Sequence, residues 1–392
     1  MAVKPIYPEG IDQTAYHAAL ELCECAGNWL FNRSDLDVWY EIDGFPIKIP
    51  AGTRVLCTGW DQVRRAVEEM GTEEFYGCTG PVGRNGFKFI GGDKRYIYDR
   101  LVVFSPDTAT HWSRRFGLPE RTLEEHIALI NTMGLDRITV VAEDLSFLLR
   151  CPGLRSVHIV HAKGIDAPLD FSPLYELPHL QDLSIDEGSN GITKSPAQRI
   201  DFARLPGLKQ LGVCTNDPHN YHVLPKLERL FHSNDKRHMD LTELSCSPVL
   251  KSLDLLCCST RSLKGIEKFP LQALSVSYLR RWEDISDLAG CASTLRMLSI
   301  DACGKIRDFS CLQELVNLEC LFLGGSNTLP DLSFVNRMPN LKVLNFSMTI
   351  DDGDLTPCLR IPYATFDKGK RHYNLKDRDL PKSKDYPGFK LI

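Results

Sequence analysis

Short hydrophobic segments with the pattern L-x-x-L-x-L recur along the chain. The nine copies begin at Leu154, Leu180, Leu208, Leu227, Leu250, Leu271, Leu295, Leu318 and Leu341, and a weaker tenth copy, "LDRITV", begins at Leu135. The alternation has a period of two, which predicts a short strand with one buried face in each copy. A unit of about 23 residues cannot bury that face alone, so we expect the units to stack into a solenoid with a parallel ladder of strands.

A second motif, D-[LFI]-[STA]-x-[LVC], lies between the strand segments. Its eight copies begin at Asp144, Asp170, Asp201, Asp240, Asp284, Asp308, Asp331 and Asp354. Asp, Ser and Thr side chains accept hydrogen bonds from the free N–H groups at the start of a helix. We therefore predict a short helix or 3₁₀ turn after each Asp, on the convex side of the solenoid.

Together, D-[IL]-S-x-L and L-x-x-L-x-L resemble the internalin-type, short-period leucine-rich repeat over residues 135–360. The resemblance implies an α/β solenoid, a horseshoe with a parallel concave β-ladder and short convex helices or 3₁₀ turns. It also implies a buried polar ladder three residues after the last strand leucine. The residues here that fit it are Asn216, Cys258, Cys303, Ser326 and Thr349. A role at the cell surface is not carried over, because we see neither a signal-peptide pattern nor a surface anchor.

We expect three parts in the chain. Residues 1–133 lack the repeat and form a small α+β N-terminal domain or an enlarged cap. "DQTAYHAALELCECAGNWL" and "TLEEHIALINTMG" predict helices there, and "GFKFIGGDKRYIYDRLVVF" predicts a hairpin. Residues 134–360 form the leucine-rich-repeat solenoid of nine to ten repeats.

Residues 361–392 are expected to form a C-terminal cap, with Tyr363 and Phe366 closing the core, and a basic tail. From Phe366 onward, eight Lys or Arg residues face four Asp residues. This tail is either a solvated segment or an arm that docks on an acidic partner.

Composition and charge narrow the functional classes. The chain is 43% hydrophobic and 25% charged, with a net charge of −5, which is typical of a globular protein that does not bind nucleic acid. We find no apolar run of membrane-spanning length and no signal-peptide pattern. The 14 cysteines include no CxxC pair, so we expect reduced thiols and no metal site. The expected protein is cytoplasmic and monomeric, without cofactor or membrane attachment.

Residues that could carry catalysis form no recognisable constellation. The glycine-rich "GCTGPVGRNGFKFIGG" lacks the phosphate-loop motifs. Cys57, Cys78, His111 and His126 could supply a thiol and an imidazole, but no local pattern brings them together. We therefore expect no enzyme. The alternative is an enzyme with a thiol-dependent site in residues 1–133, with Cys78 or Cys57 as nucleophile and the repeats as its substrate-recognition domain.

Outward positions of the strands are the candidate binding surface, because the core does not fix their identity. Met297, Cys320, Phe322 and Val343 would form an exposed apolar patch, which is typical of an interaction site. Alternatively, the C-terminal segment covers this end and makes them ordinary buried contacts. His232 takes an inward leucine position, so Phe231 could also be core. The predicted partner-binding residues are Arg229, Phe231, Asp254, Met297, Ser299, Cys320, Phe322, Val343 and Asn345.

The repeats favour a non-catalytic protein-binding module that uses the concave face. Such a module would regulate a cellular protein as an adaptor, or neutralise a toxin as an immunity protein. The sequence does not separate these two roles.

Overall fold

The computed structural model divides the chain into two compact units. The first contains Met1–Asp61, Gly83–Lys88 and Arg95–Val213, and the second contains Gln62–Val82, Phe89–Lys94 and Cys214–Ile392. The structure describes residues 3–8, 10–26, 29–42, 45–49, 51, 54–56, 74–77, 80–83, 101–104, 122–133, 136–141, 144–160, 169–186, 200–214, 223–236, 239–242, 244, 247–367 and 369–383.

The first unit begins with one helix and two small antiparallel sheets. Helix α1 (Gln13–Glu21) is capped by the Asp12 carboxylate, which accepts hydrogen bonds from the N–H groups of Thr14 and Ala15. The Tyr16 hydroxyl donates to the carbonyl of Ile6 at 2.8 Å and accepts from the Trp39 N–H at 2.7 Å, so it ties α1 to two strands. One sheet contains β1 (Val3–Ile6), β4 (Val38–Ile42) and β5 (Phe45–Ile49). The other contains β2 (Cys23–Ala26), β3 (Trp29–Asn32) and β6 (Arg54–Leu56).

This differs from the sequence-based expectation in one place. The predicted helix ends at Glu21, and the residues after it form the antiparallel β2–β3 pair. The predicted hairpin lies mostly outside the described residues, and its last part, β9 (Leu101–Phe104), is a strand that pairs in parallel with β10. The three-part division of the chain remains a prediction.

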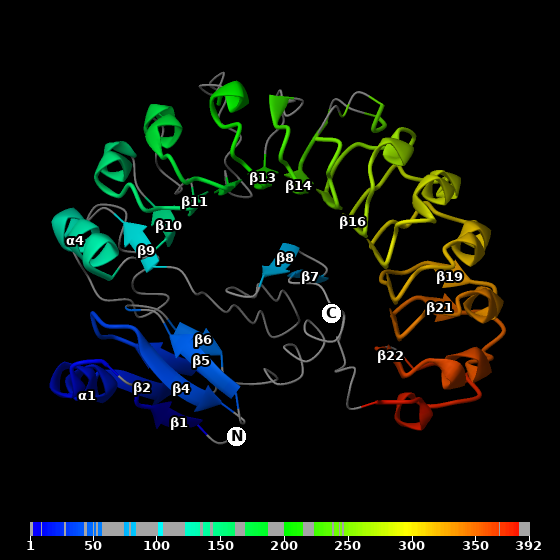
Figure 1. Ribbon diagram of the computed structural model, residues 1–392. Helices are drawn as coiled ribbons and strands as arrows, with labels where there is room; N and C mark the ends of the chain where they lie inside the picture. The colour runs from blue at the N-terminus through cyan, green and yellow to red at the C-terminus, as the bar shows by residue number, and fades with distance from the viewer. Residues whose placement is uncertain are drawn as a thin grey trace. The chain divides into compact units, whose positions relative to one another are not determined.

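A parallel ladder completes the first unit, in alternation with short helices (Figure 1). The ladder confirms the predicted strands, and their inward residues are buried: Val157 is 0% and Ile159 is 1% exposed. After β9 come α4 (Leu123–Met133), β10 (Arg137–Val141), η1 (Ser146–Arg150), β11 (Ser156–Val160), η2 (Ser172–Glu176), β12 (Asp182–Asp186), η3 (Phe202–Arg204) and β13 (Gln210–Cys214), where η is a 3₁₀ helix.

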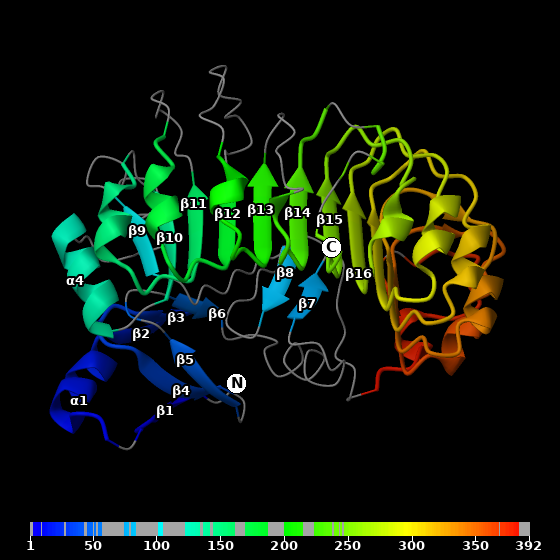
Figure 2. The same ribbon diagram turned by 45° about the horizontal axis from the view of Figure 1, so that its top comes forward.

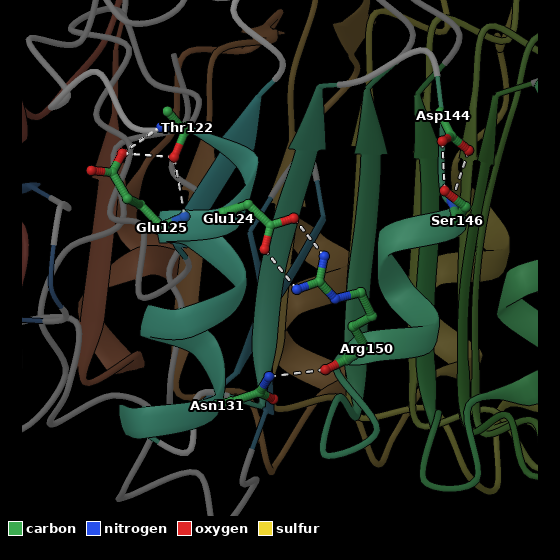
Figure 3. Close-up of polar contacts among 7 residues, drawn as sticks. All are labelled: Thr122, Glu124, Glu125, Asn131, Asp144, Ser146 and Arg150. Atoms are coloured by element: carbon green, nitrogen blue, oxygen red, sulfur yellow. Dashed lines mark hydrogen bonds and ion pairs between the residues drawn. The ribbon is translucent and has the colours of Figure 1, made fainter.

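Helix α4 lies beside η1 and is fixed to it by polar contacts (Figure 3). The Glu124 carboxylate accepts two hydrogen bonds from the Arg150 guanidinium, at 2.6 and 2.7 Å, and the Asn131 amide donates to the Arg150 carbonyl at 2.9 Å. At the start of α4, Thr122 and Glu125 cap each other's N–H groups reciprocally. Helix α4 therefore takes the place beside η1 that a 3₁₀ helix takes in later repeats.

The second unit contains a longer parallel ladder. Its 3₁₀ helices all lie on one side of the strands, the convex side of the ladder (Figures 1 and 2). Two small sheets of two strands each are separate from the ladder. One pairs β19 (Thr328–Leu329) with β21 (Thr349–Ile350), and the other pairs β7 (Glu74–Gly77) with β8 (Gly80–Gly83). The ladder strands are β14 (Arg229–Ser233), β15 (Ser252–Leu256), β16 (Ala273–Ser277), β17 (Met297–Asp301), β18 (Cys320–Leu323), β20 (Val343–Phe346) and β22 (Tyr363–Phe366). The helices are η5 (Ile266–Lys268), η6 (Ser286–Cys291), η7 (Ser310–Glu314), η8 (Ser333–Arg337), η9 (Thr356–Arg360) and η10 (Asp377–Asp379).

The Asp motif makes the predicted hydrogen bonds, and a 3₁₀ helix follows it in seven of the eight copies; after Asp240 the described residues form a bend. In all eight copies the Asp carboxylate accepts a hydrogen bond from the backbone N–H two residues later, at 2.6 to 3.1 Å. These bonds, with those from the Ser or Thr hydroxyl, lower the pKa of Asp170, Asp240, Asp308, Asp331 and Asp354. The sequence motif therefore fixes where each turn begins.

One backbone position recurs after four successive strands in a left-handed conformation. The φ angles of Asn234, Cys257, Tyr278 and Ala302 lie between 52° and 59°, and Gly325 follows at 115°. A side chain makes this conformation costly, by about 1–2 kcal/mol, whereas glycine adopts it freely. The repeat therefore imposes local strain wherever it places a residue other than glycine there.

Replacing Ala302 with glycine should relieve that strain. We expect Ala302→Gly to raise the free energy of unfolding by a few tenths of a kcal/mol to about 1 kcal/mol, measured by urea denaturation. The matched control is Ala292→Gly, because Ala292 has an ordinary φ of −56°. That control should lower stability by about 0.5–1 kcal/mol; effects of equal sign would contradict the assignment of strain.

The ladder ends in a polar clamp around Asp377. Its carboxylate accepts hydrogen bonds from the Thr365 hydroxyl at 2.7 Å, the Phe366 N–H at 2.9 Å and the Lys382 ammonium at 2.9 Å. Burial raises the pKa of Asp377, but these bonds outweigh burial and hold the pKa below its usual value. The ring of Phe366 stacks on Phe346 at 5.5 Å, whereas Tyr363 is half-buried.

The Asp377 clamp should be sensitive to acid. A lowered folded-state pKa gives stability that is present above the unfolded pKa of about 3.9 and is lost as the pH falls through the folded value. Asp377→Asn should therefore lower the melting temperature at pH 7, and the difference from the unaltered protein should shrink toward pH 3. A difference that stays constant over this range would show that the carboxylate charge is not what holds the clamp.

Candidate protein-interaction surface

Outward residues of neighbouring strands in the second unit lie side by side. Cys320 is in register with Met297 on one side and with Val343 on the other. Phe322 is likewise in register with Ser299 and Asn345. The predicted residues of these three strands therefore form two continuous rows. We call the outward side chains of β15 to β20 the strand face.

The strand face is buried, and the prediction of an exposed apolar patch is wrong. Neighbouring strands lie about 4.8 Å apart, so the side chains in a row flank each other. Of the nine predicted binding residues, only Arg229 and Phe231 are half-buried. The exposed fractions of the others are 2% for Asp254, 4% for Met297, 0% for Ser299, 0% for Cys320, 2% for Phe322, 1% for Val343 and 1% for Asn345.

Burial of the equivalent positions varies in the first unit. Thr139 and Ser156 point outward and are only 3% and 2% exposed. Strand pairing of the same kind therefore does not by itself decide how exposed an outward side chain is. The outward residues His158, Asp182, Ser184 and Gln210 are half-buried. These four residues were not among the predicted binding residues, although their repeat positions are the same.

His232 occupies the inward position, as its place in the repeat suggests. It is 4% exposed and in register with the buried Leu255, while Phe231 points outward opposite Asp254. The His232 Nε2 atom lies 3.3 Å from the carboxylate of Asp235, which is also buried. Phe231 is therefore a surface residue of β14, and it stays a candidate for binding.

Charged residues line the start of the strands. Both oxygens of the Glu319 carboxylate are engaged at 2.6 Å, one by Arg296 of the preceding repeat and one by Lys342 of the following repeat. The side chain of Glu319 is only 6% exposed. The charge of this nearly buried carboxylate is thus paired by two cations.

Two hydroxyl groups on the strand face lack a hydrogen-bond partner among the described residues. Ser275 is 2% and Ser299 is 0% exposed, and neither Oγ atom has a partner there. The two residues are neighbours in register. A buried hydroxyl without a partner is unfavourable by about 1–3 kcal/mol. The strand face therefore offers two adjacent polar groups to whatever lies over it.

Cysteines of the repeats have a structural role. The Cys258 thiol contacts the carbonyl of His232 at 3.5 Å, and the Cys303 thiol contacts that of Val276 at 3.9 Å, one repeat earlier in each case. Burial raises the pKa of both thiols to about 12, so they are neutral at pH 7. The predicted polar ladder is confirmed at these two positions.

Ser326 does not belong to that ladder. Ser326 is exposed, and the buried Asn327 takes the ladder position, donating to the carbonyls of Cys303 at 3.2 Å and Ile306 at 2.9 Å. The shift by one residue coincides with Gly324 and Gly325 at the end of β18. The prediction placed the ladder residue three positions after the last strand leucine, so it missed Asn327, which lies one position later. Asn is a typical residue for this role, because its amide can donate two hydrogen bonds.

A thiol-dependent active site gains no support from the described residues. Cys57, Cys78 and His111 lie outside them, and His126 is 1% exposed on α4. Where the structure describes the chain, it holds no group of three residues suited to bind a metal ion. Among its described helices, none has the length and apolar character needed to span a bilayer.

The ladder, its period and the Asp motif define the architecture. This is the leucine-rich-repeat fold, an α/β solenoid. No protein-family model matches the sequence, and no curated protein matches it.

Solved structures with a similar arrangement include leucine-rich-repeat proteins. An internalin (inlF) from Listeria monocytogenes is 16% identical, with a TM-score of 0.41 over 67% of this chain and 87% of its own. An internalin C2 from the same species is 18% identical (TM-score 0.36, 56% and 92%). A protein from Leptospira interrogans is 12% identical (TM-score 0.30, 64% and 82%). The fold assignment rests on the ladder and motifs of this chain itself.

Thiol reactivity tests the structural role of the cysteines. We expect Cys258 and Cys303 to react with iodoacetamide far more slowly than free cysteine at pH 7, because both are buried and protonated. Peptide mass spectrometry gives each rate, and unfolding in urea should make all thiols equivalent. Rapid labelling of Cys57 or Cys78 in the folded protein would instead favour the enzyme alternative.

Proposed function

We propose that the chain is a non-catalytic protein-binding module. The observation that supports this is the register of the ladder, which places half-buried outward side chains such as His158, Asp182 and Ser184 side by side while the leucines build the core. A surface of this kind can change its outward residues without changing the fold, which suits recognition of a protein partner. We further propose that it works as a cytoplasmic monomer.

The half-buried outward residues are the best candidates for direct contact. In the second unit these are Arg229 and Phe231 on β14, both from the sequence-based set. An aromatic and an arginine side chain are the types that contribute most to protein interfaces. The seven buried residues of the set can reach a partner only after the strand face opens. Binding at His158, Asp182, Ser184 and Gln210 is the corresponding proposal for the first unit.

The role of binding has two versions. As an adaptor, the module would regulate a cellular protein; as an immunity protein, it would neutralise a toxin. The captured partner distinguishes them: an immunity protein would protect cells from the toxin that it binds, and an adaptor would change the activity of a cellular enzyme.

Substitution of Phe231 tests the proposed contact. Affinity capture with the native protein identifies a partner, and binding is then measured with the purified pair. Phe231→Ser should weaken binding at least tenfold, because it removes an aromatic contact of about 1–3 kcal/mol.

The matched control is Leu359→Ser on η9. Leu359 is 48% exposed on η9, which precedes β22, and β22 lies six strands away from β14 in the ladder. This variant loses a similar exposed apolar side chain and should bind normally. Equal binding by both variants, with unchanged melting temperatures, would rule out the β14 contact.

A further inference from the structure

Two exposed turns lie side by side at the ends of β16 and β17. Ser277 and Asp301 are the last residues of these strands and are in register, and the Tyr278 N–H donates to the Asp301 carbonyl at 2.9 Å. Leu279 and Cys303 hold equivalent places in the two turns, and both are 0% exposed. The two turns therefore correspond residue by residue and lie one repeat apart.

The tips of these turns carry cations. Arg280 and Arg281 form the tip after β16, and Gly304 and Lys305 form the tip after β17. All four residues are exposed. None of the three cations forms an ion pair with a carboxylate of the described residues. We call Tyr278, Arg280, Arg281 and Lys305 the turn edge.

Acidic residues close to the turn edge do not cancel its charge. Asp284 and Asp308 begin the convex turns, where each accepts a backbone N–H at 2.8 Å. Asp301 is half-buried at the end of its strand. Within residues 278–308, Glu283 is the exposed acidic residue nearest to the tips that no turn N–H engages. Three cations against this one carboxylate leave the turn edge positive.

Tyr278 is a costly residue at its position. Its φ is 57°, a left-handed conformation that is unfavourable with a side chain and that glycine adopts freely, as at Gly325. Tyr278 is 48% exposed, and its side chain has no hydrogen bond or ring contact among the described residues. The ring therefore adds little to the fold that could offset the strain. A strained surface residue without a role in the fold points to a role in binding.

We propose that the turn edge binds an acidic segment of a protein partner. Carboxylates of the segment pair with the three cations, and the exposed ring of Tyr278 packs against its apolar atoms. Tyrosine and arginine are among the side chains that contribute most to protein interfaces, and complementary charge speeds and selects association. The turn edge thus combines the two features that such a partner needs.

The class of the partner rests on the proposed function, but the surface is different from Phe231 on β14. A protein is favoured over a nucleic acid for two reasons. The whole chain carries a net charge of −5. Nucleic-acid affinity also depends on the number of phosphates that cations neutralise, and three cations neutralise few.

A labelled peptide tests the role of the cations. The probe is a fluorescein-labelled, glutamate-rich peptide with a central leucine, and its binding to the full chain is measured by fluorescence anisotropy. We expect binding at low salt that weakens as salt rises, because exposed charges are screened. Arg280→Ser with Arg281→Ser should weaken binding by about tenfold, because two exposed ion pairs are lost.

The matched control is Lys264→Ser with Arg337→Ser. Both residues are exposed in the same unit, before η5 and at the end of η8, so this variant has the same net charge as the test variant. It should bind the peptide within about twofold of the unaltered protein, since only distant charges are lost. Absence of binding at low salt, or equal effects of the two double variants, would overturn the proposal.

Replacement of Tyr278 with glycine separates binding from stability. Tyr278→Gly relieves the left-handed strain, so it should raise the melting temperature and still weaken peptide binding by about threefold. The control Cys257→Gly relieves the same strain one repeat earlier, at the same φ of 57°, and should leave binding unchanged. A lower melting temperature for Tyr278→Gly would show that the ring is structural, and unchanged binding would show that it makes no contact; either result contradicts the proposal.

Fluorescein-labelled polyuridylate tests the other class of polyanion. If the full chain binds this RNA more tightly than the peptide, the assignment of a protein partner is wrong. Neither probe depends on Phe231. Failure of these tests therefore leaves the β14 contact standing, and failure of Phe231→Ser leaves the turn edge standing.

Discussion

Stacking of each repeat on the next is the interaction on which the whole structure depends. The inward strand leucines, such as Leu253, Leu298 and Leu321, are 0% exposed only because neighbouring repeats cover them. Burial of one leucine side chain contributes about 1.5–3 kcal/mol, and each repeat supplies several. The same stacking fixes the register of the strands, which in turn places every outward side chain in a row. The inward face of each strand therefore provides stability, and the outward face of the same strand carries the residues available for recognition.

The sequence predicted the repeated elements well, because each one depends on short-range chemistry. A period of two marked the strands, and the Asp motif marked the turns in all eight copies. Prediction failed where the chain lacks a repeat. The segment around Cys23 has helical spacing of apolar residues, yet it pairs as β2 and β3. Local propensity is a weak guide when a strand partner is available elsewhere in the fold.

The candidate surface was only half predictable, for a different reason. Periodicity tells which side of a strand faces away from the core, and it placed Met297, Phe322 and Val343 on that side. It does not tell whether that side is covered, because a contact between residues distant in the sequence leaves no local pattern. His232 is a second contact that periodicity does not predict. It is a polar residue in a leucine position, and its burial is compensated by Asp235, whose carboxylate lies 3.3 Å from its Nε2 atom.

The isolated bridge between Lys382 and Tyr363 of β22 has a consequence for the edge of the ladder. A parallel ladder ends in a strand whose N–H and C=O groups face outward, and such an edge is a template for pairing with another chain. Here Ala364 of β22 donates to the Pro381 carbonyl, and Pro362, just before β22, accepts from the Ser383 N–H. Pro381 has no N–H to offer to a further strand. These bonds occupy part of the edge of β22 and leave fewer of its backbone groups to pair with another strand.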